Sequence, residues 1–457
     1  MKNKTETKRS SFSGKLGYVL AVAGSAVGLG NIWRFPYLAA KYGGGMFLLV
    51  YLILMLTFGY AMIISETALG RFTGKSPIGA FKQFGNKIQY KFGGWINAII
   101  PMLILPYYCT LGGWVLKYLV EYINGSTKAM ADDSYFTNFI GSAAQTEIFF
   151  LIFGVATLSV VIFGVKNGIE RVSKIMMPAL IVLAVIVAIY SMSLPGAFEG
   201  VKYFLIPNFK NFSIMTVVAA LGQMFYSLSI AMGILYTYGS YLKRDVDIEK
   251  TTTQIEIFDT SIAILAGLMI IPAVFAFSGG NPDALNAGPS LMFVTIPKVF
   301  ESMGLGTAAG VVFFLLVLCA ALTSSISLAE TTISTFQDEL GWGRIKSTLA
   351  TAVILVGLGS VTTLGFNALD FVKILGMGAL DFFDFITNSV MMPISAFCTC
   401  LLIVYSAGLK TISNEVKLSS KFKREKLYNF FMKYLAPICM IIILLSSIAN
   451  VFGWIKM

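Results

Sequence analysis

The stretch Gly24-Ser-Ala-Val-Gly-Leu-Gly-Asn-Ile-Trp-Arg-Phe-Pro36 interrupts the first long apolar segment of the chain, which runs from about residue 16 to residue 40. Three glycines, an asparagine, an arginine and a proline stand where a membrane helix would be plain hydrocarbon. An unpaired backbone N–H or C=O group is costly in lipid, so a broken helix is tolerated only where it lines a cavity inside the protein. Freed carbonyl groups there can bind a cation, and freed amides an anion. We therefore predict that this break forms half of a buried site for an ion and a solute.

Apolar segments of membrane-spanning length recur along the whole chain, which has 457 residues, 56% of them apolar and only 12% charged. A soluble domain carries about a quarter charged residues. The pattern therefore predicts an all-α membrane protein with one polytopic domain over residues 1–457. We expect eleven spans, near residues 16–40, 46–70, 93–123, 147–164, 171–193, 214–241, 253–278, 306–338, 346–366, 371–407 and 425–454.

The basic residues are distributed unevenly between the two sets of loops. Alternate loops, counted from the N-terminus, hold 25 of the 34 Lys and Arg residues, and Arg34 lies within a span. This bias predicts a plasma (inner) membrane protein with a cytoplasmic N-terminus and, because the number of spans is odd, a C-terminus outside. The net charge of +11 is spread among loops and not gathered on one face, so we expect a lipid bilayer and no nucleic acid as partner.

Several chemistries are disfavoured by the composition. The chain has no histidine, and its five cysteines all fall in apolar segments, so we expect neither a zinc site nor a disulfide. A membrane enzyme would lack an evident base for a Ser or Asp nucleophile. The loop Gly70-Arg-Phe-Thr-Gly-Lys-Ser76 looks like a phosphate loop, but it is one residue short and follows a span, so we expect no nucleotide.

A second interrupted segment contains Gly222-Gln-Met-Phe-Tyr-Ser-Leu-Ser-Ile-Ala-Met-Gly233. Five spans separate the starts of the two interrupted segments, so their directions across the membrane are opposite. Corresponding interrupted segments in two halves indicate a transporter site built on an inverted repeat. We expect a first repeat over residues 16–193, a second over residues 214–407 and one extra helix over residues 425–454.

These residues closely resemble the neurotransmitter:sodium symporter family. The stretch from Gly24 to Pro36 is similar to the family's first-helix signature. The resemblance continues in order through Gly43-Gly-Gly45, Glu66, Tyr107-Tyr108, Gln223 to Gly233, Thr323-Ser-Ser325 and Asp384-Phe385. Eleven spans instead of twelve resemble certain bacterial members. The resemblance implies an inverted five-plus-five helix repeat with interrupted helices 1 and 6, and sodium-coupled symport by alternating access.

The resemblance also implies two Na⁺ sites built from oxygen ligands, which suit a hard cation. The first site would use the carbonyl of Ala26 and the side chains of Asn31, Ser227 and Asp259. The second would use the carbonyls of Gly24, Val27 and Ala320 and the hydroxyls of Thr323 and Ser324. Polar residues in spans also form ordinary helix–helix hydrogen bonds, and only their convergence favours the metal interpretation.

The implied solute is a zwitterion, an amino acid. Its carboxylate would meet the amides of Leu29 and Gly30, and its ammonium the carbonyls of Ala26, Tyr226 and Ser227 together with Ser229. Family members that carry biogenic amines have an aspartate at the position of Gly28. The side-chain pocket would be formed by Ile104, Tyr108, Tyr226, Met232, Ser324 and Leu328, a mostly apolar lining that favours a neutral hydrophobic or aromatic amino acid.

Asp259 departs from the family pattern, in which many members have Asn and the animal members bind chloride nearby. The residues that match the chloride site are Tyr51, Gln223 and Ser227, but the last partner is Ala263 instead of a serine. A fixed carboxylate could supply the negative charge that chloride supplies elsewhere. We therefore expect chloride-independent transport, unless Asp259 lies near the cytoplasmic surface.

The resemblance further implies two gates. Arg34 with Asp384 would close the outer path, with Tyr108 and Tyr226 as a lid over the substrate. Arg9 with Asp338 would close the inner path, assisted by Tyr241, with Phe12 where the family usually has Trp. Glu66 would brace both unwound segments by hydrogen bonds.

Two alternatives remain open at this stage. An ion channel would need a continuous polar stripe, whereas polarity here is confined to mid-depth. A sodium-dependent amino-acid sensor on a transporter scaffold is compatible with the same residues.

Overall fold

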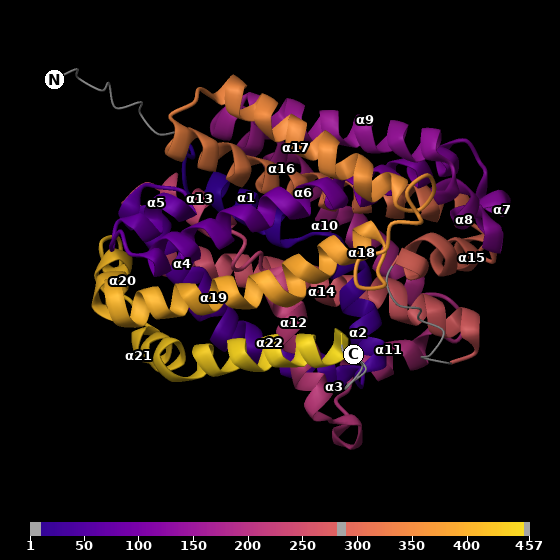
Figure 1. Ribbon diagram of the computed structural model, residues 1–457. Coiled ribbons are helices and arrows are strands. Elements are labelled where there is room, and N and C mark those ends of the chain that lie inside the picture. Colours follow the sequence, from indigo (N-terminus) through magenta and orange to yellow (C-terminus); the bar gives the residue numbers. More distant parts are fainter. Residues whose placement is uncertain (1–10, 281–288, 452–457) are drawn as a thin grey trace.

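The computed structural model describes residues 11–280 and 289–451 and shows a bundle of packed helices (Figure 1). In the described residues nine helical segments are long and apolar enough to cross a membrane. They are Gly45–Thr73 (α3, η2, α4), Ile88–Ile123 (α6), Ala143–Ile162 (α9), Val165–Met192 (η3, α10), Ile248–Ser278 (α14), Gly306–Leu340 (α16), Arg344–Leu364 (α17), Ala379–Ala407 (α18, η7, α19, η8) and Glu425–Ser446 (α21, η9 and part of α22). The predicted all-α membrane fold is confirmed.

The first predicted span is broken. Helix α1 (Lys15–Ala26) is followed by the π-helical turn η1 (Gly30–Arg34) and by α2 (Phe35–Lys41), and the two halves meet at an angle of 53°. Glycines at positions 28 and 30 have low helix propensity, which favours the interruption there.

The sixth predicted span is also interrupted. Helix α12 (Ile214–Ser227) starts at a capping box between Ser213 and Thr216. It is separated from α13 (Ile234–Ser240) by a non-helical stretch over residues 228–233. The two interrupted spans are the pair that the sequence singled out, and the larger inverted repeat stays a prediction.

Shorter helices lie at the two ends of the bundle (Figure 1). Helices α5 (Pro77–Lys82) and α20 (Leu409–Lys417) lie at the end where α21 (Glu425–Phe430) begins. At the opposite end lie α7 (Thr127–Met130), α8 (Asp133–Gly141), α11 (Ala197–Leu205) and α15 (Ile296–Glu301). The loops predicted to be cytoplasmic therefore gather at one end, and loops predicted to be outside at the other.

One predicted span has a wrong boundary. The segment predicted over residues 371–407 becomes helical only at Ala379, because residues 365–378 form turns with an isolated bridge between Ile374 and Met377. Leu375 in this stretch has a φ of +53°, which a helix does not allow. The stretch 371–375, apolar except for Lys373, misled the prediction, since hydropathy does not report backbone conformation.

The core is formed largely by α6 and α16, which pack along each other. Aromatic side chains fill the outer part of this contact. The ring of Tyr118 packs edge-to-face against that of Phe293, and its centre lies 5.3 Å from the centre of the Phe314 ring. The Tyr118 hydroxyl also donates to the carbonyl of Phe293 at 2.8 Å. This packing fixes α6 and α16 as one wall of the site described next.

Candidate functional site

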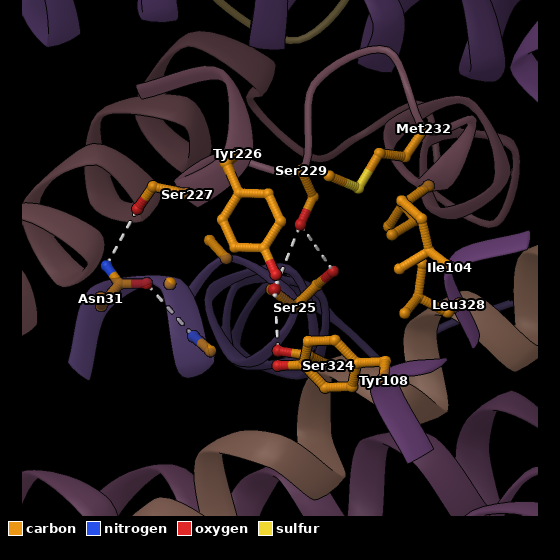
Figure 2. A pocket seen from close by; sticks show the side chains of 14 residues that line it. Ser25, Asn31, Ile104, Tyr108, Tyr226, Ser227, Ser229, Met232, Ser324 and Leu328 are labelled. Carbon is orange, nitrogen blue, oxygen red and sulfur yellow. Dashed lines mark hydrogen bonds between the residues drawn. The ribbon is translucent and has the colours of Figure 1, made fainter. Parts of the chain in front are cut away.

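A cavity lies where the two interrupted spans meet α6 and α16 (Figure 2). Its lining includes eleven of the predicted substrate and metal residues. The residues that line it are Ser25, Ala26, Gly28, Gly30, Asn31, Ile104, Tyr108, Tyr226, Ser227, Ser229, Met232, Ile234, Ser324 and Leu328. The structure therefore brings together residues that lie up to 303 positions apart in the chain, from Ser25 to Leu328.

The break in the first span is held by local hydrogen bonds. The amide of Gly28 donates to Asn31 Oδ1 at 3.2 Å, and the amide of Leu29 donates to the Tyr108 hydroxyl at 3.1 Å. A Cβ atom at Gly28 would lie 2.7 Å from Ser324 Oγ and 2.8 Å from the Tyr108 hydroxyl. Glycine is therefore required here by the close approach of α6 and α16.

The break in the sixth span uses left-handed backbone conformations. Ser229, Ala231 and Gly233 have φ values of +53°, +63° and +72°. The amide of Ala231 donates to Glu66 Oε1 at 2.9 Å, as predicted for the bracing role of Glu66. The corresponding brace to the first span is not seen, because Glu66 Oε2 is buried without a hydrogen-bond partner among the described residues.

Asp259 lies at the centre of a buried polar cluster. Its Oδ1 accepts from Ser227 Oγ at 2.7 Å and from Asn31 Nδ2 at 2.9 Å, and its Oδ2 accepts from the Tyr51 hydroxyl at 2.9 Å. The side chain is 0% exposed, and none of the ion pairs between described residues involves it. The alternative that Asp259 lies near the surface is therefore wrong. A buried carboxylate without a cationic side chain beside it favours a bound cation.

Several backbone carbonyls converge on the hydroxyl of Ser324. The carbonyl oxygens of Gly24, Ser25 and Val27 lie 3.4, 3.2 and 3.4 Å from Ser324 Oγ. One hydroxyl carries one proton, so it can satisfy one of the three carbonyls at a time. The Thr323 hydroxyl lies beside them on α16 and donates to the carbonyl of Ala320 at 3.1 Å. This excess of acceptor oxygens is the composition of a cation site.

The cavity has a polar end and an apolar end. Figure 2 shows Met232, Ile104 and Leu328 grouped on one side, away from Asn31 and Ser227 on the other. An amphipathic small molecule would therefore adopt a single orientation here, with its charged part toward the interrupted helices.

Sequence reasoning missed part of this lining. Ser25 shares a 3.2 Å hydrogen bond with Ser229, and Ile234 begins α13 just after the break. Their positions next to the interruptions were the signal that could have found them. Leu29, in contrast, was predicted to bind substrate but does not line the cavity, since its amide is taken by Tyr108.

The two residues of the predicted outer gate, Arg34 and Asp384, do not form an ion pair with each other. The Arg34 guanidinium lies over the ring of Tyr226 at 5.3 Å, and no ion pair of the described residues joins Arg34 to Asp384. Asp384 accepts instead from Asn388 at 2.6 Å and from the Tyr107 hydroxyl at 3.3 Å. Tyr226 lines both the central cavity and a second cavity, and Arg34 lines only the second.

The predicted inner gate is only partly within the described residues. Arg9 lies outside them. Asp338 accepts from the amide of Ser76 at 2.7 Å, and Tyr241 donates its hydroxyl to Glu330 Oε1 at 2.8 Å. Phe12 is buried, and its ring packs edge-on against that of Tyr241 with 6.3 Å between the ring centres. An aromatic side chain therefore makes this contact although the position holds Phe instead of Trp.

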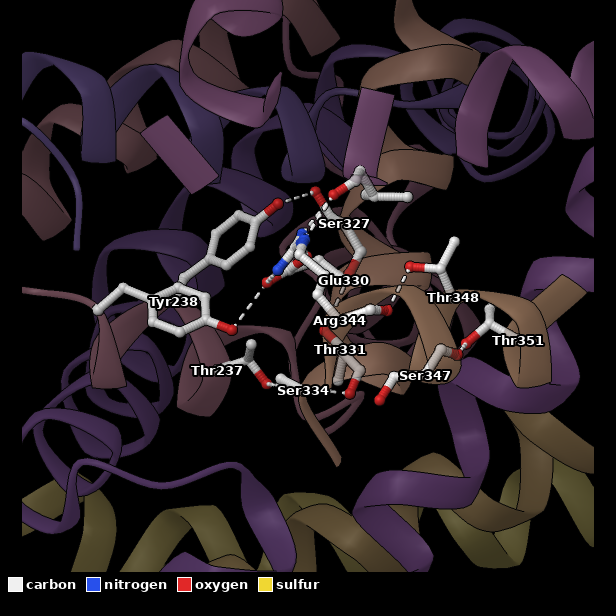
Figure 3. Close-up of polar contacts among 12 residues, drawn as sticks. Thr237, Tyr238, Ser327, Glu330, Thr331, Ser334, Arg344, Ser347, Thr348 and Thr351 are labelled. Carbon is white, nitrogen blue, oxygen red and sulfur yellow. Dashed lines mark hydrogen bonds and ion pairs between the residues drawn. The ribbon is translucent and has the colours of Figure 1, made fainter. Parts of the chain in front are cut away.

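A buried ion pair at this end was not predicted. Glu330 on α16 is 0% exposed and pairs with Arg344 of α17 at 2.5 Å (Figure 3). Next to it, Tyr238 of α13 donates to Ser327 of α16 at 2.9 Å. These contacts tie the second half of the sixth span to α16 and α17.

Comparisons with known proteins agree over nearly the whole chain. A model of the sodium:neurotransmitter symporter family matches residues 9–136 and 137–454. The uncharacterised sodium-dependent transporter YhdH of Bacillus subtilis is 34% identical over 451 residues, which cover 97% of this chain and 99% of that protein. A sodium- and chloride-dependent GABA transporter of Drosophila melanogaster is 26% identical over 466 residues, covering 90% of this chain and 48% of that protein.

A solved structure is also similar. The crystal structure of MhsT in complex with L-phenylalanine matches with a TM-score of 0.87 and 36% identity, and covers 96% of this chain and 100% of MhsT. The interrupted helices, the buried oxygen cluster and these relatives define a multi-pass, sodium-dependent membrane transporter. The chain belongs to the sodium:neurotransmitter symporter family. Its relatives are transporters and not enzymes.

Proposed function

We propose that this transporter couples the entry of Na⁺ to the uptake of a neutral hydrophobic or aromatic amino acid, by alternating access and without chloride. The observation that carries the proposal is the cavity between the two interrupted spans, which has backbone oxygens and Asp259 beside one end and Ile104, Met232 and Leu328 at the other. The L-phenylalanine bound to MhsT supports the same class of substrate.

The amino acid would lie with its charged groups at the interruptions. The amides of Leu29 and Gly30 lead into η1, so the partial positive charge of a helix start favours a carboxylate there. For Leu29 this requires the Tyr108 hydroxyl to release its amide and to bind the carboxylate itself. The carbonyls of Ala26, Tyr226 and Ser227, with the Ser229 hydroxyl, would take the ammonium group.

Two Na⁺ ions would bind beside the amino acid. The first would contact Asp259, Ser227, the Ala26 carbonyl and Asn31, whose amide would turn so that Oδ1 replaces Nδ2. The second would contact the Thr323 and Ser324 hydroxyls and the carbonyls of Gly24, Val27 and Ala320. Both sites join the first interrupted span to other helices. Bound sodium would therefore stabilise the arrangement in which these helices are in contact.

The Asp259 carboxylate would replace chloride. Tyr51 and Ser227, two residues that match the family's chloride ligands, donate to this carboxylate at 2.9 and 2.7 Å. A fixed negative charge at that place balances the first Na⁺ without an anion from solution.

The paths to the cavity would open in turn. On the outer side, Tyr226 and Tyr108 would move aside to open the path. Arg34 and Asp384 would approach each other when the path closes. On the inner side, Arg9, Asp338 and Tyr241 would separate. The N-terminus would lie in the cytoplasm and the C-terminus outside.

A binding and flux experiment tests this function. Purified protein is screened against the twenty amino acids with Na⁺ or with K⁺, and the best ligand is then followed into proteoliposomes. We expect sodium-dependent binding of an apolar amino acid, followed by saturable uptake driven by a Na⁺ gradient. Binding without uptake would identify a sensor, and current without saturation would identify a channel.

A further inference from the structure

A groove lies apart from the transport cavity, at the end of the bundle predicted to be cytoplasmic. It runs between the first half of α14, the adjoining residues of α3 (Gly45–Leu54) and η2 (Met55–Gly59), and the segment 418–424 that leads into α21. Its lining combines lysines, buried carboxylates and lipid-facing apolar side chains. The residues are Leu52, Leu56, Asp247, Glu249, Lys250, Thr253, Gln254, Glu256, Ile257, Thr260, Ser261, Ser420, Lys421, Lys423 and Arg424.

The rim of the groove carries more positive than negative charge: three lysines face one carboxylate, that of Asp247, which caps α14 by accepting from the amide of Lys250. Lys250, Lys421 and Lys423 are exposed, and none of the ion pairs between described residues uses them. The nearest ion pairs involve Arg424, whose guanidinium also lies 3.6 Å from the centre of the Tyr60 ring. The rim therefore offers three ammonium groups to an anion.

The inner part of the groove has the opposite character. Glu256 is only 2% exposed; its Oε2 lies 3.4 Å from the Arg424 guanidinium, while its Oε1 has no hydrogen-bond partner among the described residues. Arg424 is shared with Glu249, which lies 3.8 Å away. A buried acceptor without a donor is costly, so a hydrogen-bond donor from a ligand would stabilise it.

The wall that faces the membrane is apolar. Leu56 and Ile257 are 54% and 59% exposed, and Leu52 continues the same wall deeper in the bilayer. Lys250 and Glu256 are separated by roughly 9 Å along α14. A phosphate with a short hydroxylated headgroup spans that separation when a lysine side chain reaches toward it.

We propose that this groove binds one anionic glycerophospholipid with a hydroxylated headgroup, of the phosphatidylglycerol kind, from the cytoplasmic leaflet. The phosphate lies against Lys421, Lys423 and Lys250, a headgroup hydroxyl donates to Glu256 Oε1, and an acyl chain follows Leu56 and Ile257. The site does not depend on the identity of the transported solute.

Native mass spectrometry of the full-length protein in detergent tests the site. The protein is titrated with phosphatidylglycerol, phosphatidylethanolamine or phosphatidylcholine of identical acyl chains, and the first bound lipid is quantified. We expect phosphatidylglycerol to bind at least about 10-fold more tightly than the other two lipids. The pair Lys421→Gln/Lys423→Gln should weaken it by about 30-fold, since each lysine near an anionic headgroup contributes about fivefold.

Two matched controls separate the groove from general effects. Lys87→Gln/Lys91→Gln removes the same charge from the start of α6, at the same end of the bundle, and should leave the affinity unchanged. Ile257→Trp fills the groove without altering charge and should also abolish tight binding, whereas Val353→Trp on the exposed face of α17 should not. The proposal would be overturned if phosphatidylcholine or phosphatidylethanolamine bound as tightly as phosphatidylglycerol. It would also be overturned if the two lysine pairs caused equal losses of affinity.

Discussion

Replacing the carboxylate of Asp259 by an amide gives the sharpest test of the sodium site. Asp259→Asn keeps the size of the side chain and removes one negative charge from a position that is 0% exposed. The hydrogen bonds can be preserved, because the new amide oxygen can accept from Ser227 and the Tyr51 hydroxyl can accept instead of donating. The fold should therefore persist while the charge is lost.

The size of the effect follows from the electrostatics of a buried pair. Two unit charges about 4 Å apart interact by about 4 kcal/mol at an effective dielectric constant of about 20. That energy corresponds to nearly 1000-fold in affinity, and the amide oxygen that remains as a ligand recovers part of it. We therefore expect the affinity for Na⁺ to fall on the order of 100-fold, and chloride to restore much of it.

The assay is sodium-dependent thermal stabilisation, measured in gluconate and in chloride. A ligand that binds only the folded state raises stability in proportion to the logarithm of its concentration over its dissociation constant, so a sodium titration gives the affinity. Tyr51→Phe serves as the matched control, because it removes one hydrogen bond to the same carboxylate and keeps the charge.

Two results would refute the reasoning. One is an Asp259→Asn protein whose sodium affinity in gluconate stays within about threefold of the unmutated value, far from the loss expected for a buried charge. The other is an unmutated protein that needs chloride for sodium-dependent uptake, since the carboxylate would then not be replacing the anion.

Three further substitutions test the geometry of the interruptions. Gly28→Ala places a Cβ atom 2.7 Å from Ser324 Oγ and 2.8 Å from the Tyr108 hydroxyl, so amino-acid affinity measured by isothermal titration should fall at least about 10-fold. An unchanged affinity would show that the approach is not tight. Ala231→Gly relieves a left-handed conformation at φ +63° and should raise the free energy of unfolding by up to about 1 kcal/mol, seen as a higher midpoint in thermal unfolding. A lower midpoint would contradict it. Glu66→Ala leaves the amide of Ala231 unpaired and should cost about 1–3 kcal/mol, whereas Glu66→Gln keeps an acceptor and should cost less; equal losses would argue against the brace.

The amino-acid sequence by itself determined the membrane fold and the places where helices break. Apolar length fixes the spans, because twenty or so apolar residues find a stable place only across a bilayer. Gly28, Gly30 and Gly233 mark the interruptions, because glycine weakens a helix wherever it stands in the chain. Both signals are local, so neither depends on what packs against them. The boundary at Ala379 was missed for the same reason, since the apolar residues before it form turns.

Tertiary structure alone decided which groups meet. Asn31 and Asp259 are 228 positions apart, and Gly24 and Ser324 are 300 positions apart, yet each pair is in contact. Periodicity and composition carry no information about such distances, because they report only on neighbours within one helix. The isolation of Asp259 from any cationic side chain among the described residues, the convergence of three carbonyls on one hydroxyl, and the pairing of Glu330 with Arg344 all arise when helices pack. Helix packing therefore decides which buried charges and acceptors have a partner and which do not.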